Sequence, residues 1–365
     1  MIYYILQCSN KYSGTASYNR VRLFNEALNH LGVNNKVNLL ILDSKAFLIV
    51  KIFRYIKCFL QFLMIIIKCG KKDFIIVYGL NSFCCLYPLI KRRTNFIIER
   101  TEYPAILTIN SISKNLKRLS LMNLKYYHYA DLFITCSSYL EKYYKSFVEN
   151  IFISPLIVKV DEYNKANGFK ITKYPYIAYC GNLDNNKDGV PILIKSFAIF
   201  HKYYPEVRLV IIGSGGEQSL KELETIIMEN QINGFVIFTG GIPHEEVSCI
   251  LTNASMLTLA RPNNKQAEGG IPSKVGEYLA SGVPCVITRT GDLPRYLHDG
   301  VDCYLCEPDS VEVFANKMIQ CYNEDPTSVV IEAKRTVMQF NYIEQAKRLL
   351  NCLEKHFNIK ILIQE

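Results

Sequence analysis

The segment from Arg261 to Thr288, RPNNKQAEGGIPSKVGEYLASGVPCVIT, carries residue types that suit the binding of an anion. Glycines and a proline keep its first part out of regular structure, and Ser273 and Lys274 stand where a helix is predicted to begin. Free N–H groups at a helix start, a hydroxyl and an ammonium together form a natural phosphate site. Glu277, one turn later, is placed to accept hydrogen bonds from a sugar hydroxyl. The alternative is an ordinary helix-to-strand connection, which any α/β protein contains.

Two earlier loops carry further candidates. In GNLDNNKDG, Gly181 leaves a strand and Lys187 precedes a helix predicted from about Val190 to Tyr203, so this lysine is placed to reach a phosphate. A solvated loop lysine is the alternative. In LVIIGSGGE, Gly213 opens a glycine turn between a strand and a helix, but the spacing is not that of GxGxxG. A tight turn beside a nucleotide is therefore favoured over hydride chemistry.

The elements that must position these loops alternate regularly along the chain. Apolar strand-like runs are separated by probable helices, which predicts two parallel α/β sheets of the doubly wound kind. A polar, irregular segment from Val158 to Tyr174 separates the two series and is interpreted as a hinge. Ligands of such sheets bind outside the carboxyl ends of the strands, so we expect a site in a cleft between the two domains. The expected strands are Ile2–Leu6, Lys36–Ile41, Phe74–Tyr78, Asn95–Glu99, Leu132–Thr135, Ile151–Ser154, Tyr176–Cys180, Arg208–Ile212, Val236–Thr239, Met256–Leu259, Pro284–Thr288 and Cys303–Cys306.

Length and composition agree with this organisation. The 365 residues are enough for about two cores, and 49% of them are apolar. The predicted domains are residues 1–165, residues 166–335, and a C-terminal helix within 336–365 that crosses back to the first domain. The first ten residues resemble a β-strand rather than a signal peptide. The thirteen cysteines are an odd number, which does not suit a closed disulfide framework. We expect a cytoplasmic protein whose CYLC pair, Cys303 and Cys306, serves in packing.

Charge is divided unevenly between the halves. Residues 1–170 carry 24 Lys and Arg against 10 Asp and Glu, whereas the remainder carries 18 against 23. The halves therefore bear +14 and −5, and the first half is expected to meet an anionic surface. The segment Ala46 to Ile67 favours lipid, because Lys51, Arg54 and Lys57 form a basic stripe on an apolar helix. Its uncharged run is too short to span a bilayer, so the helix is expected to lie on an anionic membrane or to pack as a core helix.

The combination of GNLDNNKDGVPILIKSFAIF, LVIIGSGGE, FTGGIPHEEV and LARPNNKQAEGGIPSKVGEYLASGVPCVITRTGD resembles the C-terminal domain of retaining glycosyltransferases of the GT-B fold, family 4. The resemblance covers Tyr176 to about Asp309. The N-terminal half is less similar, although NKYSGTASYNRVRLFNEALNHLG looks like the loop and first helix that face the sugar. The resemblance implies two Rossmann-like domains facing across a cleft, the second of which holds a nucleotide-sugar donor.

The resemblance also implies roles for individual residues. Glu277 matches the second glutamate of the family's paired motif, which holds the ribose, and Lys187 matches the lysine on the donor diphosphate. Gly14 matches the N-terminal loop glycine. Two positions depart from the family pattern: Gly269 replaces the first glutamate, and Asn182 replaces an arginine. The complete set of expected donor-binding residues is Gly14, Gly181, Asn182, Gly213, Arg261, Glu268, Gly270, Pro272, Ser273 and Lys274.

In this interpretation Glu268 substitutes for the missing glutamate, and Lys274 for the missing positive charge. The expected catalytic residues are Lys187, Glu277 and Glu102. Glu102 follows the fourth strand, and the alternative for it is a surface loop carboxylate. No Asp-x-Asp triplet occurs, so we expect cationic side chains and a helix dipole to act without a metal or cofactor.

The leading hypothesis is a hexosyltransferase that extends a glycan or lipid-linked acceptor in cell-surface polysaccharide synthesis at the inner face of the membrane. A nucleotide-sugar epimerase of the same fold and a catalytically idle scaffold subunit of a glycan assembly complex are the alternatives. Nucleic-acid binding is not expected, because the basic half contains no recognisable DNA- or RNA-binding module.

Overall fold

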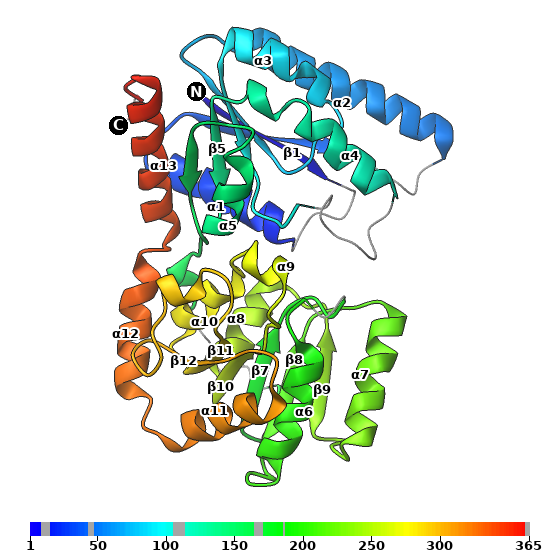
Figure 1. Ribbon diagram of the computed structural model, residues 1–365, viewed down its shortest axis with the longest axis vertical. Helices are drawn as coiled ribbons and strands as arrows, with labels where there is room; N and C mark the ends of the chain where they lie inside the picture. The colour runs from blue at the N-terminus through cyan, green and yellow to red at the C-terminus, as the bar shows by residue number, and fades with distance from the viewer. Residues whose placement is uncertain (9–14, 43–46, 105–113, 164–170, 185–186, 362–365) are drawn as a thin grey trace. The chain divides into compact units, whose positions relative to one another are not determined.

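The computed structural model describes residues 1–8, 15–42, 47–104, 114–163, 171–184 and 187–361. These residues form two compact units. Unit 1 comprises Met1–Ile157 together with Tyr342–Glu365, and unit 2 comprises Val158–Asn341. Each unit is built on a parallel sheet of six strands flanked by helices (Figure 1). The expected fold of two Rossmann-like domains is confirmed.

The sheet of unit 1 has the strand order β2-β1-β3-β4-β5-β6, and all neighbouring strands are parallel. The chain adds β2 on one side of β1 and then adds β3 to β6 on the other side, so the topological switch point lies between β1 and β3. Its strands are β1 (Ile2–Cys8), β2 (Asn35–Ile41), β3 (Phe74–Tyr78), β4 (Asn95–Glu99), β5 (Leu132–Thr135) and β6 (Ile151–Ile153). Its α-helices are α1 (Ala16–His30), α2 (Leu48–Lys68), α3 (Tyr87–Arg93), α4 (Lys114–Leu124), α5 (Ser138–Tyr144) and α13 (Tyr342–Phe357), with short 3-10 turns η1 (Cys84–Leu86) and η3 (Tyr127–Tyr129).

Both faces of this sheet are buried, which explains why its strands appear in the sequence as continuous apolar runs. Along β3, Ile75 and Val77 contribute to one core together with residues of α2, α3 and α5. The alternate residues Phe74, Ile76 and Tyr78 contribute to a second core with α1 and α13. The period of two along the strand assigns successive side chains to opposite faces.

The last helix, α13, completes the second of these cores. Ala346, Leu349 and Leu353 are fully buried in it, and the ring of Phe357 lies 5.4 Å from the ring of Phe74 in β3. Gln345 is also fully buried and accepts a hydrogen bond from the Ser154 hydroxyl at 3.0 Å. The C-terminal segment thus belongs to unit 1 although it follows unit 2 in the sequence.

Unit 2 has the strand order β12-β11-β10-β7-β8-β9 and is again wholly parallel. The chain moves from β7 through β8 to β9, then returns to the other side of β7 with β10. Its strands are β7 (Tyr176–Cys180), β8 (Arg208–Ile212), β9 (Val236–Gly240), β10 (Met256–Leu259), β11 (Cys285–Thr288) and β12 (Tyr304–Cys306). Its helices are η4 (Val160–Tyr163), α6 (Val190–His201), α7 (Glu217–Glu229), α8 (His244–Thr252), α9 (Lys265–Glu268), α10 (Lys274–Ser281), η5 (Leu293–Arg295), α11 (Val311–Asn323) and α12 (Thr327–Met338).

All thirteen cysteines lie in the described part of the chain and are free thiols. In the CYLC sequence, Cys303 and Cys306 are buried at β12. Burial raises the pKa of the Cys306 thiol to about 12, and also raises that of Cys303. A raised pKa disfavours the thiolate that redox and metal chemistry require, as expected for cysteines that serve in packing.

Candidate functional site

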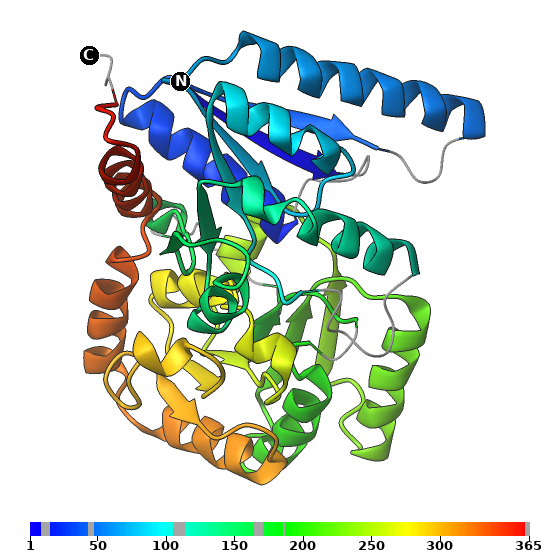
Figure 2. The same cartoon turned by 45° about the horizontal axis from the view of Figure 1, so that its top comes forward.

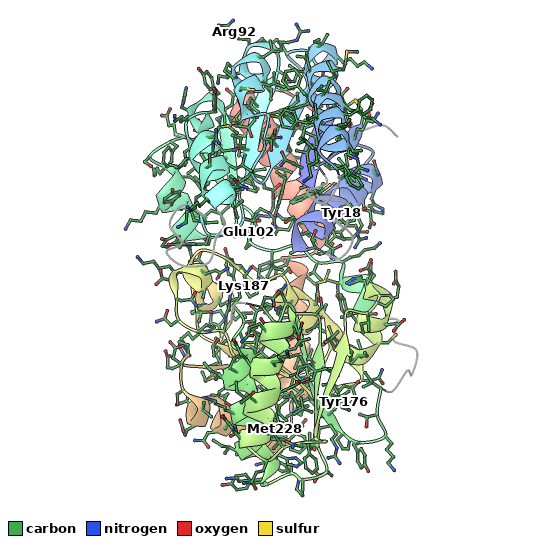
Figure 3. The ribbon with its side chains drawn as sticks, turned by 90° about the vertical axis from the view of Figure 1, so that its right-hand side faces the viewer. Tyr18, Arg92, Glu102, Tyr176, Lys187 and Met228 are labelled. Carbon is green, nitrogen blue, oxygen red and sulfur yellow. The ribbon has the colours of Figure 1, made fainter. Side chains whose placement is uncertain are left out.

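The strand order of unit 2 places a topological switch point between β7 and β10, where ligands of doubly wound sheets bind. Three segments meet there. The loop after β7 supplies Asp188. Arg261 is the second residue after β10, and Lys274 is the first residue of α10. Figure 3 shows Lys187 at the end of unit 2 that carries these loops.

Asp188 is the centre of a buried charged cluster with Tyr179, Arg261 and Lys274, which we call the Asp188 cluster. Its carboxylate is ion-paired with the Lys274 ammonium, and its Oδ1 lies 3.7 Å from Nε of Arg261. The Tyr179 hydroxyl lies 3.0 Å from Oδ2 of Asp188 and 3.4 Å from Nζ of Lys274. Asp188 is only 5% exposed and Arg261 only 2%. The cluster therefore holds two cations against one carboxylate away from bulk water.

The charge balance of this cluster determines the ionisation of Asp188. Burial opposes the charged carboxylate, but Lys274, Arg261 and the Tyr179 hydroxyl outweigh burial and lower the pKa of Asp188 below its usual value. The guanidinium of Arg261 also donates to the carbonyl of Gly270 at 2.7 Å, which fixes the loop that leads into α10. Two cations facing one anion leave a net positive charge at the switch point.

Glycines allow the chain to pass closely around this cluster. A Cβ on Gly181 would clash with Nζ of Lys274 and with the Tyr179 hydroxyl. Gly213, the first residue after β8, has a φ of 141° and lies against the carbonyl of Gly181. Only glycine adopts this conformation readily, and a side chain there would separate the loops after β7 and β8. These two predicted donor-binding glycines therefore set the local geometry.

The N-terminus of α10 presents the expected backbone donors. Ser273 has helical φ and ψ angles and an exposed side chain that does not cap the helix. Within the part of the chain that the structure describes, the amides of Ser273 and Lys274 have no hydrogen-bond acceptor, whereas the next amide, that of Val275, donates to the carbonyl of Pro272 at 3.1 Å. Such amides, combined with the helix dipole, favour an anion at this position.

Glu277 lies one turn further along α10, partly open to solvent and close to a second polar group. The hydroxyl of Tyr163, from η4, is hydrogen-bonded to its carboxylate. His244, the first residue of α8, is nearby, and its Nε2 lies 3.1 Å from a carboxylate oxygen of Glu162. Burial raises the pKa of Glu277 above its ordinary value, while His244 and Lys274 oppose that change. Burial thus disfavours the charged carboxylate of Glu277, and the nearby His244 and Lys274 favour it.

The other predicted residues of unit 2 have mixed surroundings. Lys187 is half-buried and contacts no described residue through a hydrogen bond or ion pair. Asn182 is exposed, and its Oδ1 accepts from the amide of Asp184 at 2.6 Å. Glu268 is exposed at the end of α9, whereas Gly269 is buried and ends that helix. Gly14 lies outside the described residues.

Glu102 is exposed in the segment after β4 of unit 1. Glu99, the last residue of β4, is fully buried and forms an ion pair with Arg20 of α1, in which Nε of Arg20 lies 2.6 Å from Oε1 of Glu99. Burial raises the pKa of Glu99, and Arg20 counteracts this. Arg20 also donates to the carbonyl of Ser154 at 2.9 Å, so the pair joins α1, β4 and the end of β6. This arrangement is structural, and the carboxylate open to solvent is that of Glu102.

Sequence reasoning missed Asp188, Tyr179, Tyr163 and His244. Asp188 stands directly after Lys187, so an acidic residue beside a proposed phosphate ligand was an available signal. Tyr163 falls in the segment that was interpreted as a hinge, yet η4 packs against α8 and α10 within unit 2. No spacing rule connects His244 or Tyr179 to Glu277 or Lys274, because the parallel sheet alone brings them together.

The two sheets with their flanking helices define the two-domain, Rossmann-like GT-B fold. Residues 174–324 match the model of the family "Glycosyl transferases group 1". The match lies within unit 2 and includes the whole Asp188 cluster, α10 and Glu277. This part of the chain is therefore similar to a group 1 glycosyltransferase domain. No curated protein sequence matches the chain.

Solved structures of low sequence identity share the fold. Sucrose-phosphate synthase from Thermosynechococcus elongatus is 15% identical with a TM-score of 0.75, and the alignment covers 98% of this chain and 100% of that chain. Anabaena HepE, in complex with UDP and glucose, is 14% identical with a TM-score of 0.71, covering 97% and 99%. The pneumococcal O-GlcNAc transferase GtfA, in complex with UDP and GlcNAc, is 18% identical with a TM-score of 0.62, covering 83% of this chain and 60% of that chain. The present chain thus spans only 60% of the length of GtfA.

Proposed function

We propose that this protein transfers a hexose from a nucleotide diphosphate sugar to a glycan or lipid-linked acceptor in cell-surface polysaccharide synthesis, with retention of anomeric configuration as in family 4. The observation that carries the proposal is the Asp188 cluster beside the N-terminus of α10. It lies at the switch point of the domain that matches the group 1 family. Family 4 membership and retention rest on the sequence resemblance.

In this proposal the donor diphosphate lies against the first turn of α10. The free amides of Ser273 and Lys274 bind its oxygens, and the Lys274 ammonium turns toward the diphosphate from its contact with Asp188. Lys187, on the adjacent loop, adds a second positive charge. As the glycosyl bond breaks, negative charge grows on the departing diphosphate, and these groups stabilise it in place of a metal ion. Glu277 accepts hydrogen bonds from the ribose hydroxyls.

The first experiment is a thermal shift screen of the full chain against UDP, GDP, ADP and their sugars. A ligand that binds only the folded state raises the melting temperature by mass action. UDP compounds are the first to test, because the HepE and GtfA structures contain UDP. The proposal predicts stabilisation by one of the nucleoside diphosphates, and the absence of any shift with all three would contradict it.

The decisive variant is Lys187→Ala, assayed for sugar transfer with the donor that the screen identifies. Loss of a charge-stabilising group is expected to reduce kcat by roughly 10²- to 10³-fold. Lys195→Ala is the matched control, because Lys195 is exposed on the following helix α6. An unchanged rate for Lys187→Ala would refute the role of this lysine.

Metal dependence is tested separately with EDTA. We expect sugar transfer to persist in excess EDTA, and a loss of activity that Mg²⁺ restores would refute metal independence.

A binding subunit without turnover is a second candidate, and one local observation favours it. Gly269 ends α9 at the position where the family carries its first motif glutamate, and the neighbouring Glu268 side chain is exposed to solvent. Donor binding in the thermal shift screen without transfer to any acceptor would support this candidate. Conversion of the donor to another sugar in the absence of acceptor would instead identify an epimerase.

A further inference from the structure

The outer face of helix α2 in unit 1 is apolar and exposed. Only Cys58, Phe62, Ile65 and Ile66 of this 21-residue helix are buried, and all four lie between its midpoint and its C-terminal end. Figure 1 and Figure 2 show its N-terminal end extending past the strands of unit 1. None of the first ten residues of α2, residues 48–57, is buried against the rest of unit 1.

Six of the exposed apolar side chains form one continuous stripe, which we call the outer stripe. Their spacing of three or four residues places them on one side of the helix, opposite the buried side chains. Between the first and the last of them the helix rises about 27 Å. The outer stripe comprises Ile49 (81% exposed), Phe53 (71%), Ile56 (51%), Leu60 (52%), Met64 (51%) and Ile67 (49%).

Positive charges accompany the outer stripe. Helix α2 contains Lys51, Arg54, Lys57 and Lys68 and no acidic residue. The neighbouring helix α3 ends in Lys91, Arg92 and Arg93. Arg93 donates to the carbonyls of Ile66 and Ile67 at 3.0 and 2.7 Å, which fixes the basic end of α3 beside the end of α2. The helical period places Lys57 and Lys68 beside the outer stripe, whereas Lys51 and Arg54 lie toward the opposite side of α2.

We propose that the outer stripe docks unit 1 on an anionic lipid surface, with α2 lying in the plane of the interface. The apolar side chains enter the boundary between headgroups and acyl chains, and the basic side chains beside the stripe, Lys57 and Lys68, contact lipid phosphates. Among the described residues, no helix is long and apolar enough to cross a membrane. A second copy of the chain is a poorer occupant, because pairing two α2 helices would bring like charges together without an acidic partner.

Vesicle co-sedimentation of the full chain tests this docking without donor or acceptor, so its outcome is independent of the proposed transfer activity. Binding is expected to vesicles that contain phosphatidylglycerol, to weaken with added salt, and to be much lower with pure phosphatidylcholine. Equal binding to both vesicle types that is insensitive to salt would overturn the proposal, as would the absence of binding.

Variants locate the surface. Ile49→Glu combined with Phe53→Glu places charges on two exposed positions and is expected to lower partitioning at least about tenfold, because two apolar side chains no longer enter the lipid. Met228→Glu is the matched control, since Met228 is 58% exposed on α7 of unit 2 and is expected to bind like the unmodified protein. Circular dichroism verifies that each variant is folded. Unchanged lipid binding by the double variant would refute the assignment to α2.

Analytical ultracentrifugation without lipid distinguishes the competing occupant. The proposal expects the same sedimentation coefficient for the unmodified protein and for the double variant. A dimer that Ile49→Glu with Phe53→Glu dissociates would show that a second copy covers the outer stripe, and would overturn the docking proposal.

Discussion

Asp188 holds the ammonium of Lys274, and this contact joins the loop after β7 to the first turn of α10. The lysine that is proposed to bind the diphosphate therefore has a carboxylate partner on the protein in the structure described here. Arg261 and Tyr179 flank the same carboxylate, so the pair is part of a buried set rather than a surface ion pair.

Asp188→Asn is expected to destabilise unit 2 by about 3–5 kcal/mol at pH 7, because it leaves two buried cations without their counter-ion. The pKa of Asp188 is lowered in the folded state, so its stabilising contribution is complete above the ordinary value of 3.8 and is lost as the pH falls through the folded-state pKa. Urea unfolding at pH 7, 6 and 5 should give a constant difference. Asp161→Asn, at an exposed residue of η4, is the control, and a difference that already shrinks between pH 7 and 5 would contradict the assignment.

The double variant Asp188→Asn with Lys274→Met separates the structural role of the pair from its role in binding. Removing both charges is expected to recover part of the stability that Asp188→Asn loses, because one of the unpaired buried cations is gone. Nucleoside diphosphate affinity should nevertheless stay at least about tenfold below that of the unmodified protein, since a charge-assisted hydrogen bond is absent. Isothermal titration calorimetry measures the affinity, and full recovery of binding would exclude Lys274 as a donor ligand.

Glu277 is expected to give donor binding an acidic limit. Its pKa is raised by burial, so on acidification the carboxylate becomes protonated at a higher pH than an ordinary glutamate with a pKa of 4.5. Protonation removes an acceptor for ribose hydroxyls, and donor affinity should fall as the pH decreases through the raised pKa. Glu277→Gln should weaken binding at pH 7 and abolish this pH dependence. An identical pH profile for Glu277→Gln would show that another group titrates.

Gly181→Ala is expected to disrupt the Asp188 cluster without changing any of its charges. The added methyl group would clash with Nζ of Lys274 and with the Tyr179 hydroxyl, so one of these groups must move. We expect a loss of stability of about 1–3 kcal/mol together with weaker donor binding. Gly241→Ala is the control, because the nearest side-chain atom to its Cβ would lie 3.9 Å away. Equal effects of the two substitutions on donor affinity would argue against a role for the close packing at Gly181.

The sequence was sufficient to predict both sheets, because strands that are buried on both faces appear as short apolar runs between helical segments. The start of α10 at Lys274 was also predictable, since Pro272 and the glycines before it prevent an earlier helix. The partner of Lys274 was not predictable from the sequence. Asp188 and Lys274 are 86 residues apart and meet only because the loop after β7 and the first turn of α10 converge at the switch point.

The surroundings of Glu277 were likewise inaccessible to spacing rules. Tyr163 comes from a short turn within a polar segment, and such segments are usually interpreted as linkers. For α2, the sequence revealed an apolar helix with a basic stripe, but it left open which residues pack on the sheet. That distinction depends on where the helix extends past the strands, which only the folded chain determines.

The return of α13 to unit 1 has a consequence for the order of events during synthesis. Leu349 and Leu353 complete a core whose other members, including Phe24 and Ile76, leave the ribosome first. All of unit 2 emerges between them and can fold as one continuous segment. Unit 1 instead keeps one apolar face of its sheet partly uncovered until the final helix arrives, so a nascent chain should need protection from aggregation there for longest.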